Sequence, residues 1–221
     1  MYVNAAFETD EDAAWAFVSE RAFGAVVAVD GGRPVASHVP LLVTGDGAHR
    51  SIEFHLARAN PLHEVIAAAP QVTVVVSGPD AYISPDWYTS EDQVPTWNYI
   101  AAHIDGTARP MPPERAHAHV EAMSLAFESR LAPKKPWSTS KMAERRLAMM
   151  LSAIVPIEIE VQSIEASFKL SQNKTVSDAY EVARMLAWRG GSGERAIAEA
   201  IQKRLKSERT KDRTREKAGA Q

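Results

Sequence analysis

Two short polar segments of the chain hold residue types that bind anions. The first is HLARANP, His55 to Pro61, where Arg58 follows a predicted strand and Asn60 can cap a helix that begins at Pro61. Free backbone N–H groups at a helix start attract anions, and an arginine can hold a phosphate through two hydrogen bonds. A surface arginine beside an ordinary helix cap would have the same sequence, so this segment leaves both interpretations open.

The second segment is FKLSQN, Phe168 to Asn173, at the end of another predicted strand. Lys169 supplies a positive charge, and Ser171 and Gln172 supply groups that can hydrogen-bond a phosphate or ribityl hydroxyls. A polar turn that leads into the next helix explains the segment equally well. Together the two segments offer one cation each for a dianionic phosphate.

An aromatic, proline-rich stretch lies between these segments: GPDAYISPDWYTSEDQVPTWNYIAAH, Gly78 to His103. Its prolines mark places where a strand must stop and the chain must turn. Aromatic residues between such turns cover the end of a core or form a flat binding wall. Because side chains alternate along a strand, Trp97 and Tyr99 share one face while Asn98 takes the other.

Other chemistries find little support in the sequence. The chain has no cysteine, which excludes disulfides, zinc–thiolate sites, iron–sulfur clusters and a cysteine nucleophile. It has no G-x-S-x-G, Walker A, H-E-x-x-H or G-x-G-x-x-G motif. His117 and His119 are two apart in a predicted helix, so their rings point away from one another and chelation is not expected. We assign no catalytic residue and no metal ligand.

These segments need a scaffold, and the hydrophobic pattern predicts a mainly β chain with helices, of the α+β class. Short strands separated by tight turns favour an antiparallel barrel. In the last strand the apolar parity changes at Ser163, which indicates a bulge or a barrel corner. Helices are expected at 62–68, 112–131, 141–151 and after Thr175, and the polar chain from Glu208 is expected to be frayed or disordered. The predicted strands are 23–29, 33–44, 51–56, 71–77, 97–108 and 155–168.

Charge is unevenly distributed along the chain. Lys203 to Lys217 holds eight basic and three acidic residues, a net +5, which leaves −8 on the rest of a chain of net charge −3. An acidic body with a basic end is a poor nucleic-acid footprint. No signal peptide and no apolar run long enough to span a bilayer are visible, so we expect a cytoplasmic protein without a membrane partner.

The wording of four separated segments resembles the PaiB-type family, the FMN-binding negative transcriptional regulators. These are GPDAYISPDWY followed by VPTWNY, HLARANP, FKLSQN, and the pair MYVNAAFETDE and GRPVASHVPLL. The resemblance covers roughly Met1 to Leu186. It implies a six-stranded split β-barrel similar to pyridoxamine-phosphate oxidases, a homodimer, and FMN in a cleft between the subunits. The domains expected are a flavin-binding barrel at 1–188, with a helical insertion at about 112–151, and a C-terminal helix and tail at 189–221.

The resemblance also implies which residues contact FMN. Arg58, Asn60, Lys169 and Ser171 would hold the phosphate end, with Gln172 beside them. Ser37 and His38 would lie along the isoalloxazine ring, although a strand histidine satisfied by its neighbours is the simpler interpretation of His38. Trp97 and Asn98 would complete the pocket.

The family name implies a regulator, and an FMN-dependent oxidoreductase is the enzymatic alternative. In that case the flavin would carry the redox step and the protein would position it. A haem-binding split barrel is a further alternative, with His38, His55, His63 and His103 as available ligands. A regulator that binds DNA through its basic tail is another alternative.

Overall fold

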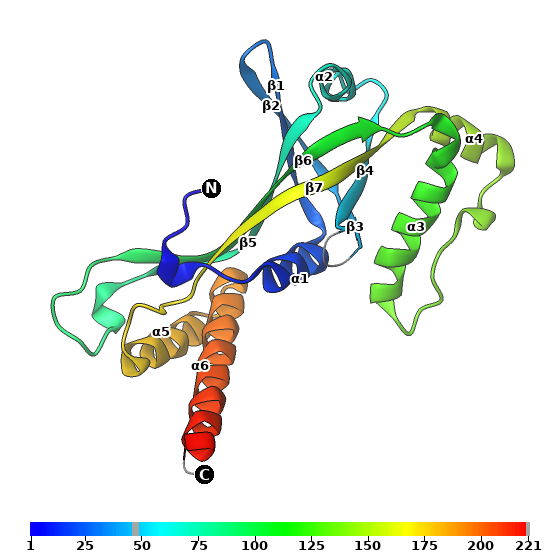
Figure 1. Cartoon of the computed structure of the whole chain (residues 1–221). Helices are drawn as coiled ribbons and strands as arrows, with labels where there is room; N and C mark the ends of the chain where they lie inside the picture. The colour runs from blue at the N-terminus through cyan, green and yellow to red at the C-terminus, as the bar shows by residue number, and fades with distance from the viewer. Residues whose placement is uncertain (46–48, 220–221) are drawn as a thin grey trace. The chain divides into compact units, whose positions relative to one another are not determined.

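The computed structural model describes residues 1–45 and 49–219, and the chain divides into two compact units. The barrel unit comprises Asp10–Val76 and Ala102–Glu165, and the terminal unit comprises Met1–Thr9, Ser77–Ala101 and Ala166–Gln221. Strands β5, β6 and β7 contribute residues to both units (Figure 1).

The sheet has seven strands in the order β2-β1-β5-β6-β7-β4-β3. Hairpin β1–β2 closes through Gly31 and Gly32, which both have positive φ as a tight turn requires. Strand β4 pairs with β7 along its whole length and with β3 on its other side. The strands are β1 Phe23–Asp30, β2 Arg33–Pro40, β3 Leu42–Thr44, β4 Ser51–Ala57, β5 Gln71–Ile83, β6 Thr96–Pro110 and β7 Ile154–Lys169.

One predicted strand, 33–44, is two strands in the structure, which makes seven strands instead of six. Leu41 separates β2 from β3, and these two strands lie at opposite ends of the strand order. A single connecting residue cannot span an open seven-stranded sheet, so the two edges of the sheet must meet. Leu41 itself is buried, and its N–H donates to the carbonyl of Ala22 at 2.9 Å. The barrel is therefore closed at this corner.

The barrel core follows the two-residue period of the strands. Ile52, Phe54 and Leu56 of β4 are buried, while Glu53 and His55 between them lie on the opposite face. In β7 the predicted parity change is confirmed, because Gln162 and Ser163 are both exposed.

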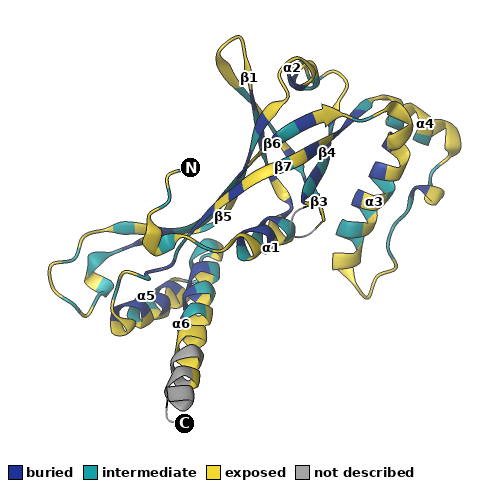
Figure 2. Cartoon of the chain, in the orientation of Figure 1, coloured by how far each residue is buried: buried dark blue, intermediate teal, exposed yellow. Residues whose placement is uncertain are grey.

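Four helices accompany the barrel unit: α1 Glu11–Arg21, α2 Leu62–Ala68, α3 Ala116–Glu128 and α4 Glu144–Ser152. Asp10 caps α1, since its carboxylate accepts from the N–H of Ala13 at 2.7 Å. Helix α4 starts three residues later than predicted because Thr139–Lys141 forms a separate 3-10 turn. No residue of α4 is buried, as Figure 2 shows.

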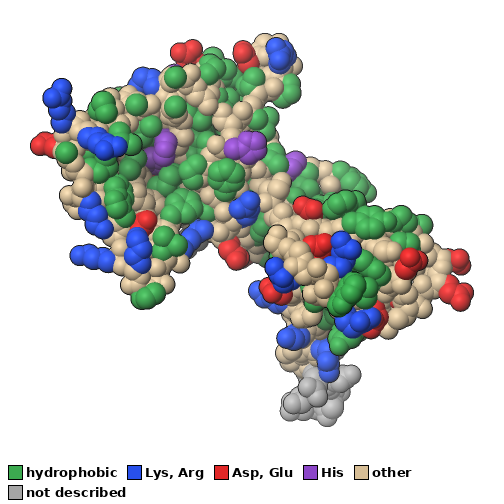
Figure 3. All heavy atoms as spheres, turned by 180° about the vertical axis from the view of Figure 1, so that it is seen from behind, with side chains coloured by type: hydrophobic (Ala, Val, Ile, Leu, Met, Phe, Trp, Pro, Cys, Tyr) green, Lys and Arg blue, Asp and Glu red, His purple; other side chains and the backbone are tan. Residues whose placement is uncertain are grey.

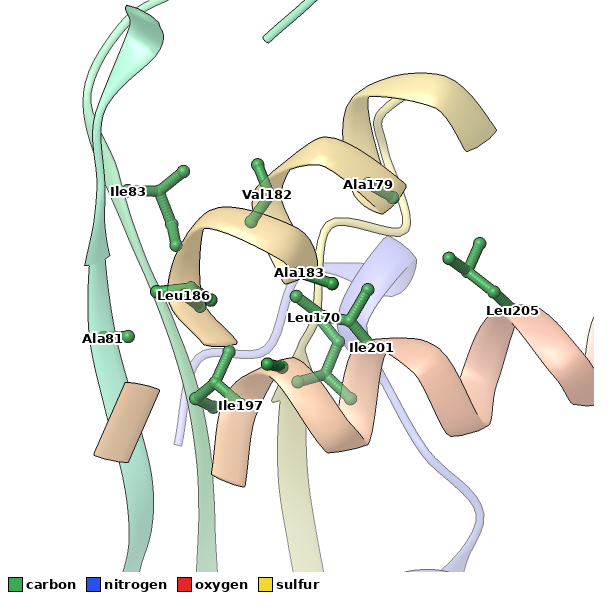
Figure 4. Close-up of a cluster of buried hydrophobic side chains, with 11 residues drawn as sticks. Ala81, Ile83, Leu170, Ala179, Val182, Ala183, Leu186, Ile197, Ile201 and Leu205 are labelled. Carbon is green, nitrogen blue, oxygen red and sulfur yellow. The ribbon is translucent and has the colours of Figure 1, made fainter. Parts of the chain in front are cut away.

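In the terminal unit, α5 Val176–Arg189 and α6 Ser192–Gly219 pack against one another. The predicted break between them is confirmed, with Gly190 ending α5 at φ 74°. Helix α6 continues through the residues from Glu208 that we expected to be disordered, so that prediction is wrong. The side chains of both helices meet those of β5 in one core (Figure 4), which contains Ala81, Ile83, Leu170, Ala179, Val182, Ala183, Leu186, Ile197, Ala198, Ile201 and Leu205.

A buried carboxylate fastens the aromatic stretch to α5. Oδ1 of Asp178 accepts from the N–H groups of Thr89 and Ser90, at 2.7 and 3.0 Å, and Oδ2 accepts from the Ser90 hydroxyl at 2.7 Å. Burial alone would raise the pKa of Asp178, but hydrogen bonds from Ser90, Thr89 and Thr175 hold it well below its ordinary value. The loop that carries Tyr88 is therefore tied to a helix by an ionised group.

Within the described residues, no helix has the length and apolar character needed to cross a membrane.

We predict that Asp178→Asn lowers the free energy of unfolding by about 1–3 kcal/mol at pH 7, because the amide has no negative charge and its NH2 group cannot accept from the Ser90 hydroxyl. Since the folded pKa is depressed, the carboxylate stabilises above the ordinary carboxyl pKa, and this stabilisation fades as pH falls toward the folded pKa. The difference in the free energy of unfolding between wild type and variant should therefore decrease at acidic pH.

Urea denaturation followed by tryptophan fluorescence at several pH values measures this effect. The exposed carboxylate of Asp86 lies in the same stretch, so Asp86→Asn is the matched control and should leave the midpoint unchanged. Equal effects of the two substitutions would contradict the assignment.

Candidate functional site

A polar cavity of about 220 Å³ lies in the terminal unit. Three segments that are far apart in the sequence form it: the N-terminal residues, the aromatic stretch and the end of β7 with the loop after it. None of the described residues that line it is Asp or Glu, so this lining carries no negative side chain. The lining residues are Asn4, Ala6, Phe7, Tyr88, Val94, Thr96, Asn98, Lys169, Ser171, Asn173 and Lys174.

Two lysines give the cavity its charge. Nζ of Lys169 donates to the Thr96 hydroxyl at 2.7 Å and lies 5.5 Å from the ring centre of Phe7. Nζ of Lys174 donates to the side-chain oxygen of Gln93 at 2.5 Å and lies 4.7 Å from the ring centre of Tyr88. Neither bond uses a carboxylate, so both charges stay uncompensated there and favour an anion.

Two residues of the predicted site, Asn98 and Ser171, contact one another in the lining of the cavity. Nδ2 of Asn98 donates to the Ser171 hydroxyl at 2.9 Å, and the two residues are 1% and 3% exposed. Ser171 has φ 63°, a left-handed conformation that is uncommon for serine. A backbone held in this way marks a position that the surrounding structure fixes.

Gln172 and Trp97 do not line the cavity. The side chain of Gln172 braces its own turn, because it accepts from the N–H of Leu170 at 2.6 Å and donates to the carbonyl of Phe168. Trp97 is 53% exposed and meets Tyr82 edge to face. Their predicted contacts with a cofactor stay predictions.

Tyr88 and Lys174 are among the lining residues that sequence reasoning missed. The hydroxyl of Tyr88 is buried and has no hydrogen-bond partner among the described residues. Burial, and then the charge of Asp178, raises the pKa of this phenol, so at neutral pH it is a donor. This buried phenol therefore lacks a hydrogen bond that buried polar groups usually make. The signal for Lys174 was its place directly after FKLSQN.

The other predicted contacts lie in the barrel unit, where two of them form a pair. Nδ2 of Asn60 donates to the hydroxyl of Ser37 at 2.9 Å, and its Oδ1 accepts from the N–H of Leu62 at 3.0 Å. Asn60 therefore satisfies the first N–H of α2, although the cap position is Pro61, one residue later than predicted, and the helix begins at Leu62. His38 is exposed and stacks on Phe23, with the ring centres 6.3 Å apart.

Arg58 has a structural task in this structure. Its Nε donates to the carbonyl of Ser152 at 2.8 Å, and its Nη2 donates to the carbonyl of Ile154 at 3.0 Å. These carbonyls belong to the last residue of α4 and the first residue of β7, and Arg58 supplies donors that the helix end lacks. Two of its guanidinium nitrogens are therefore engaged on the backbone.

Comparison with known proteins places these features in a family. Residues 1–163 match the family model described as "Putative FMN-binding domain". The "Protease synthase and sporulation protein PAI 2" of Bacillus subtilis is 34% identical over 209 residues, which are 94% of this chain and 100% of that protein.

Two solved structures share the fold at low sequence identity. A FAD and haem binding protein from Mycobacterium smegmatis has a TM-score of 0.55 at 15% identity, covering 83% of this chain and 79% of that one. A conserved hypothetical protein from Mycobacterium tuberculosis has a TM-score of 0.54 at 12% identity, covering 78% and 92%.

The lysine-lined cavity can hold an anion such as the phosphate of a flavin nucleotide, and the closed seven-stranded sheet fits a split barrel. The chain therefore belongs to the FMN-binding family that its motifs resemble, with a split-barrel fold and FMN as its cofactor.

Proposed function

We propose that the phosphate of FMN binds in the cavity of the terminal unit, between Lys169 and Lys174. The observation that carries this proposal is the pair of ammonium groups in a cavity without a carboxylate. A phosphate dianion would neutralise both charges and accept their hydrogen bonds.

The size of the cavity supports binding of one end of the cofactor. Pockets that enclose whole ligands measure roughly 300–1,000 Å³, whereas this cavity measures about 220 Å³. We assign it to the phosphate and the adjoining part of the ribityl chain. When bound, FMN supplies electron transfer, and the residues of this chain hold and orient it.

The barrel-unit residues keep their predicted roles as separate proposals. Ser37 and His38 are proposed contacts of the isoalloxazine, and Asn60 fixes Ser37 through its amide. The predicted phosphate contact of Arg58 has less support than that of the lysines, because its guanidinium already holds two carbonyls. Replacing Arg58 would also release the end of α4, which would mix a binding effect with a stability effect.

We infer that the chain acts as a flavin-dependent regulator or redox protein, ahead of direct DNA binding or haem binding. Direct DNA binding has only the basic end of α6 in its favour, against a body of charge −8. Among the histidines weighed as haem ligands, His38 stacks on Phe23 and His63 is bonded to the carbonyl of Arg58 at 3.0 Å. Neither arrangement marks an axial ligand.

The proposed phosphate site predicts a difference between FMN and riboflavin, which lacks the phosphate. Lys169→Ala and Lys174→Ala should each weaken FMN binding at least about tenfold, because each removes a charge-assisted hydrogen bond. Riboflavin affinity should stay within about twofold. Titration followed by flavin fluorescence measures both affinities.

Lys203→Ala is the matched control, since Lys203 is an exposed lysine of α6 in the same unit. Equal weakening of both ligands by the cavity variants would overturn the phosphate assignment while leaving flavin binding intact. If neither FMN nor riboflavin binds the wild-type protein, the proposed function itself is wrong.

We also propose a homodimer that uses the surface of α3 and α4. Four large apolar residues of this region are at least half exposed: Leu125, Leu131, Met149 and Met150. Apolar side chains reach the surface over this region, at the left of Figure 3. Large apolar side chains gathered on a surface are typical of an interaction site. A second copy of the chain would cover them.

The double variant Met149→Glu/Met150→Glu should therefore dissociate the dimer at micromolar concentration, because it places charge in an apolar interface. Analytical ultracentrifugation measures the change. Lys203→Glu, at an exposed position of α6 outside the proposed interface, should leave the mass unchanged. A monomeric wild type, or a double variant that stays dimeric, would contradict the proposed interface.

A further inference from the structure

Three titratable side chains form a chain of hydrogen bonds on the outer face of β4. Nδ1 of His119 lies 2.9 Å from Oε2 of Glu53, and its Nε2 lies 3.0 Å from Nδ1 of His55. Glu53 and His55 are two residues apart on one strand, so they share a face. Helix α3 places His119 between them, and the side chain of His119 is 0% exposed.

Only one arrangement of protons satisfies these bonds in neutral imidazoles. The Glu53 carboxylate can only accept, so Nδ1 of His119 carries the hydrogen. Nε2 of His119 then has a lone pair, and Nδ1–H of His55 donates to it. His55 is left with a lone pair on Nε2, and among residues 1–45 and 49–219 nothing is hydrogen-bonded to that atom.

We propose that Glu53, His119 and His55 form a proton relay, and that Nε2 of His55 is an acid–base site. A substrate X–H gives its proton to Nε2 of His55 and keeps the bonding electron pair as X⁻. The proton on Nδ1 of His55 then moves to Nε2 of His119. The products are X⁻, a neutral His55 with hydrogen on Nε2, and a His119 cation held against Glu53.

The relay holds one proton at a time. Burial, and then the positive charge of His119, lowers the pKa of His55, so a second proton on the pair is disfavoured. Protonation thus converts Nε2 of His55 from an acceptor into a donor. The substrate of the relay would carry a group that exchanges a single proton with His55, such as an acidic C–H beside a carbonyl, a hydroxyl or an N–H.

The neighbouring elements place both charged and uncharged side chains around the relay. Glu158 on β7 lies opposite Glu53 and adds negative charge, while Pro156 lies opposite His55. On α3, His117 and Glu121 are both engaged with Thr139. The neighbour of Glu53 on β3 is Leu42, which has no charge. The paired positions on β4 and β7 therefore carry carboxylates, from Glu53 and Glu158.

Nitrogen-15 NMR of the full-length chain with labelled histidines tests the relay without any ligand. At high pH, Nε2 of His55 should be unprotonated. On acidification one proton should enter the pair, so that both nitrogens of His119 become protonated while Nδ1 of His55 loses its hydrogen. Glu53→Gln keeps an acceptor for Nδ1–H but removes the charge, so proton uptake should shift about one pH unit or more lower. His117→Gln is the matched control on α3 and should leave the titration unchanged.

Two results would overturn the proposal. The first is a high-pH spectrum with hydrogen on Nε2 of His55, and the second is an added proton that stays on His55 while His119 keeps an unprotonated nitrogen. Acylation of unprotonated imidazoles by diethyl pyrocarbonate, mapped by mass spectrometry, checks access independently. His55 should react and buried His119 should not, and modification of the exposed His117 alone would show that the acid–base site is closed to substrates.

Discussion

The one-residue connection at Leu41 is the constraint on which the barrel depends. It joins β2 and β3, which lie at opposite edges of a seven-stranded order, so the sheet has to close. Closure gives β4 an inner face of Ile52, Phe54 and Leu56 and an outer face that α3 covers. The relay through His119 depends on that arrangement, because Glu53 and His55 both lie on the outer face of β4.

Asp178, Lys169 and Lys174 are charged side chains whose hydrogen bonds are to neutral groups. Asp178 is ionised among hydroxyl and N–H donors, and it fixes the loop that carries Tyr88. Lys169 and Lys174 are bonded to neutral oxygens, which leaves their charge available to an anion. Asp178 holds the aromatic stretch in place, and Lys169 and Lys174 receive the phosphate in our proposal. Preorganised charges of this kind bind a cofactor without a large rearrangement.

Local patterns predicted much of the fold, and non-local contacts account for the errors. Alternating apolar residues identified the strands, and the cap at Thr175 and the parity change at Ser163 were both visible in the sequence. The stretch 33–44 is apolar through Leu41 and Leu42, so its division into two strands depends on pairing with different partners. The polar end of α6 looked disordered because its composition gives no hydrophobic stripe beyond Leu205.

The predictions for the site divide in the same way, into residues found from local motifs and residues that only non-local contacts bring together. Lys169, Ser171 and Asn98 were predicted from motifs, and the structure brings them to one cavity. Lys174 and Tyr88 were missed because their approach depends on loops that meet only in the folded chain. His119 was discounted because its neighbour His117 points elsewhere, yet its partners lie on β4, more than sixty residues away.

The central claim is that two lysines hold the phosphate of FMN, and phosphorus-31 NMR of the bound cofactor tests it most directly. A free phosphate monoester loses its second proton near pH 6. Between two ammonium groups the dianion is favoured, so the bound resonance should stay that of the dianion to a clearly lower pH. A bound phosphate that titrates like free FMN would contradict the account, because its charge would then be facing water instead of Lys169 and Lys174.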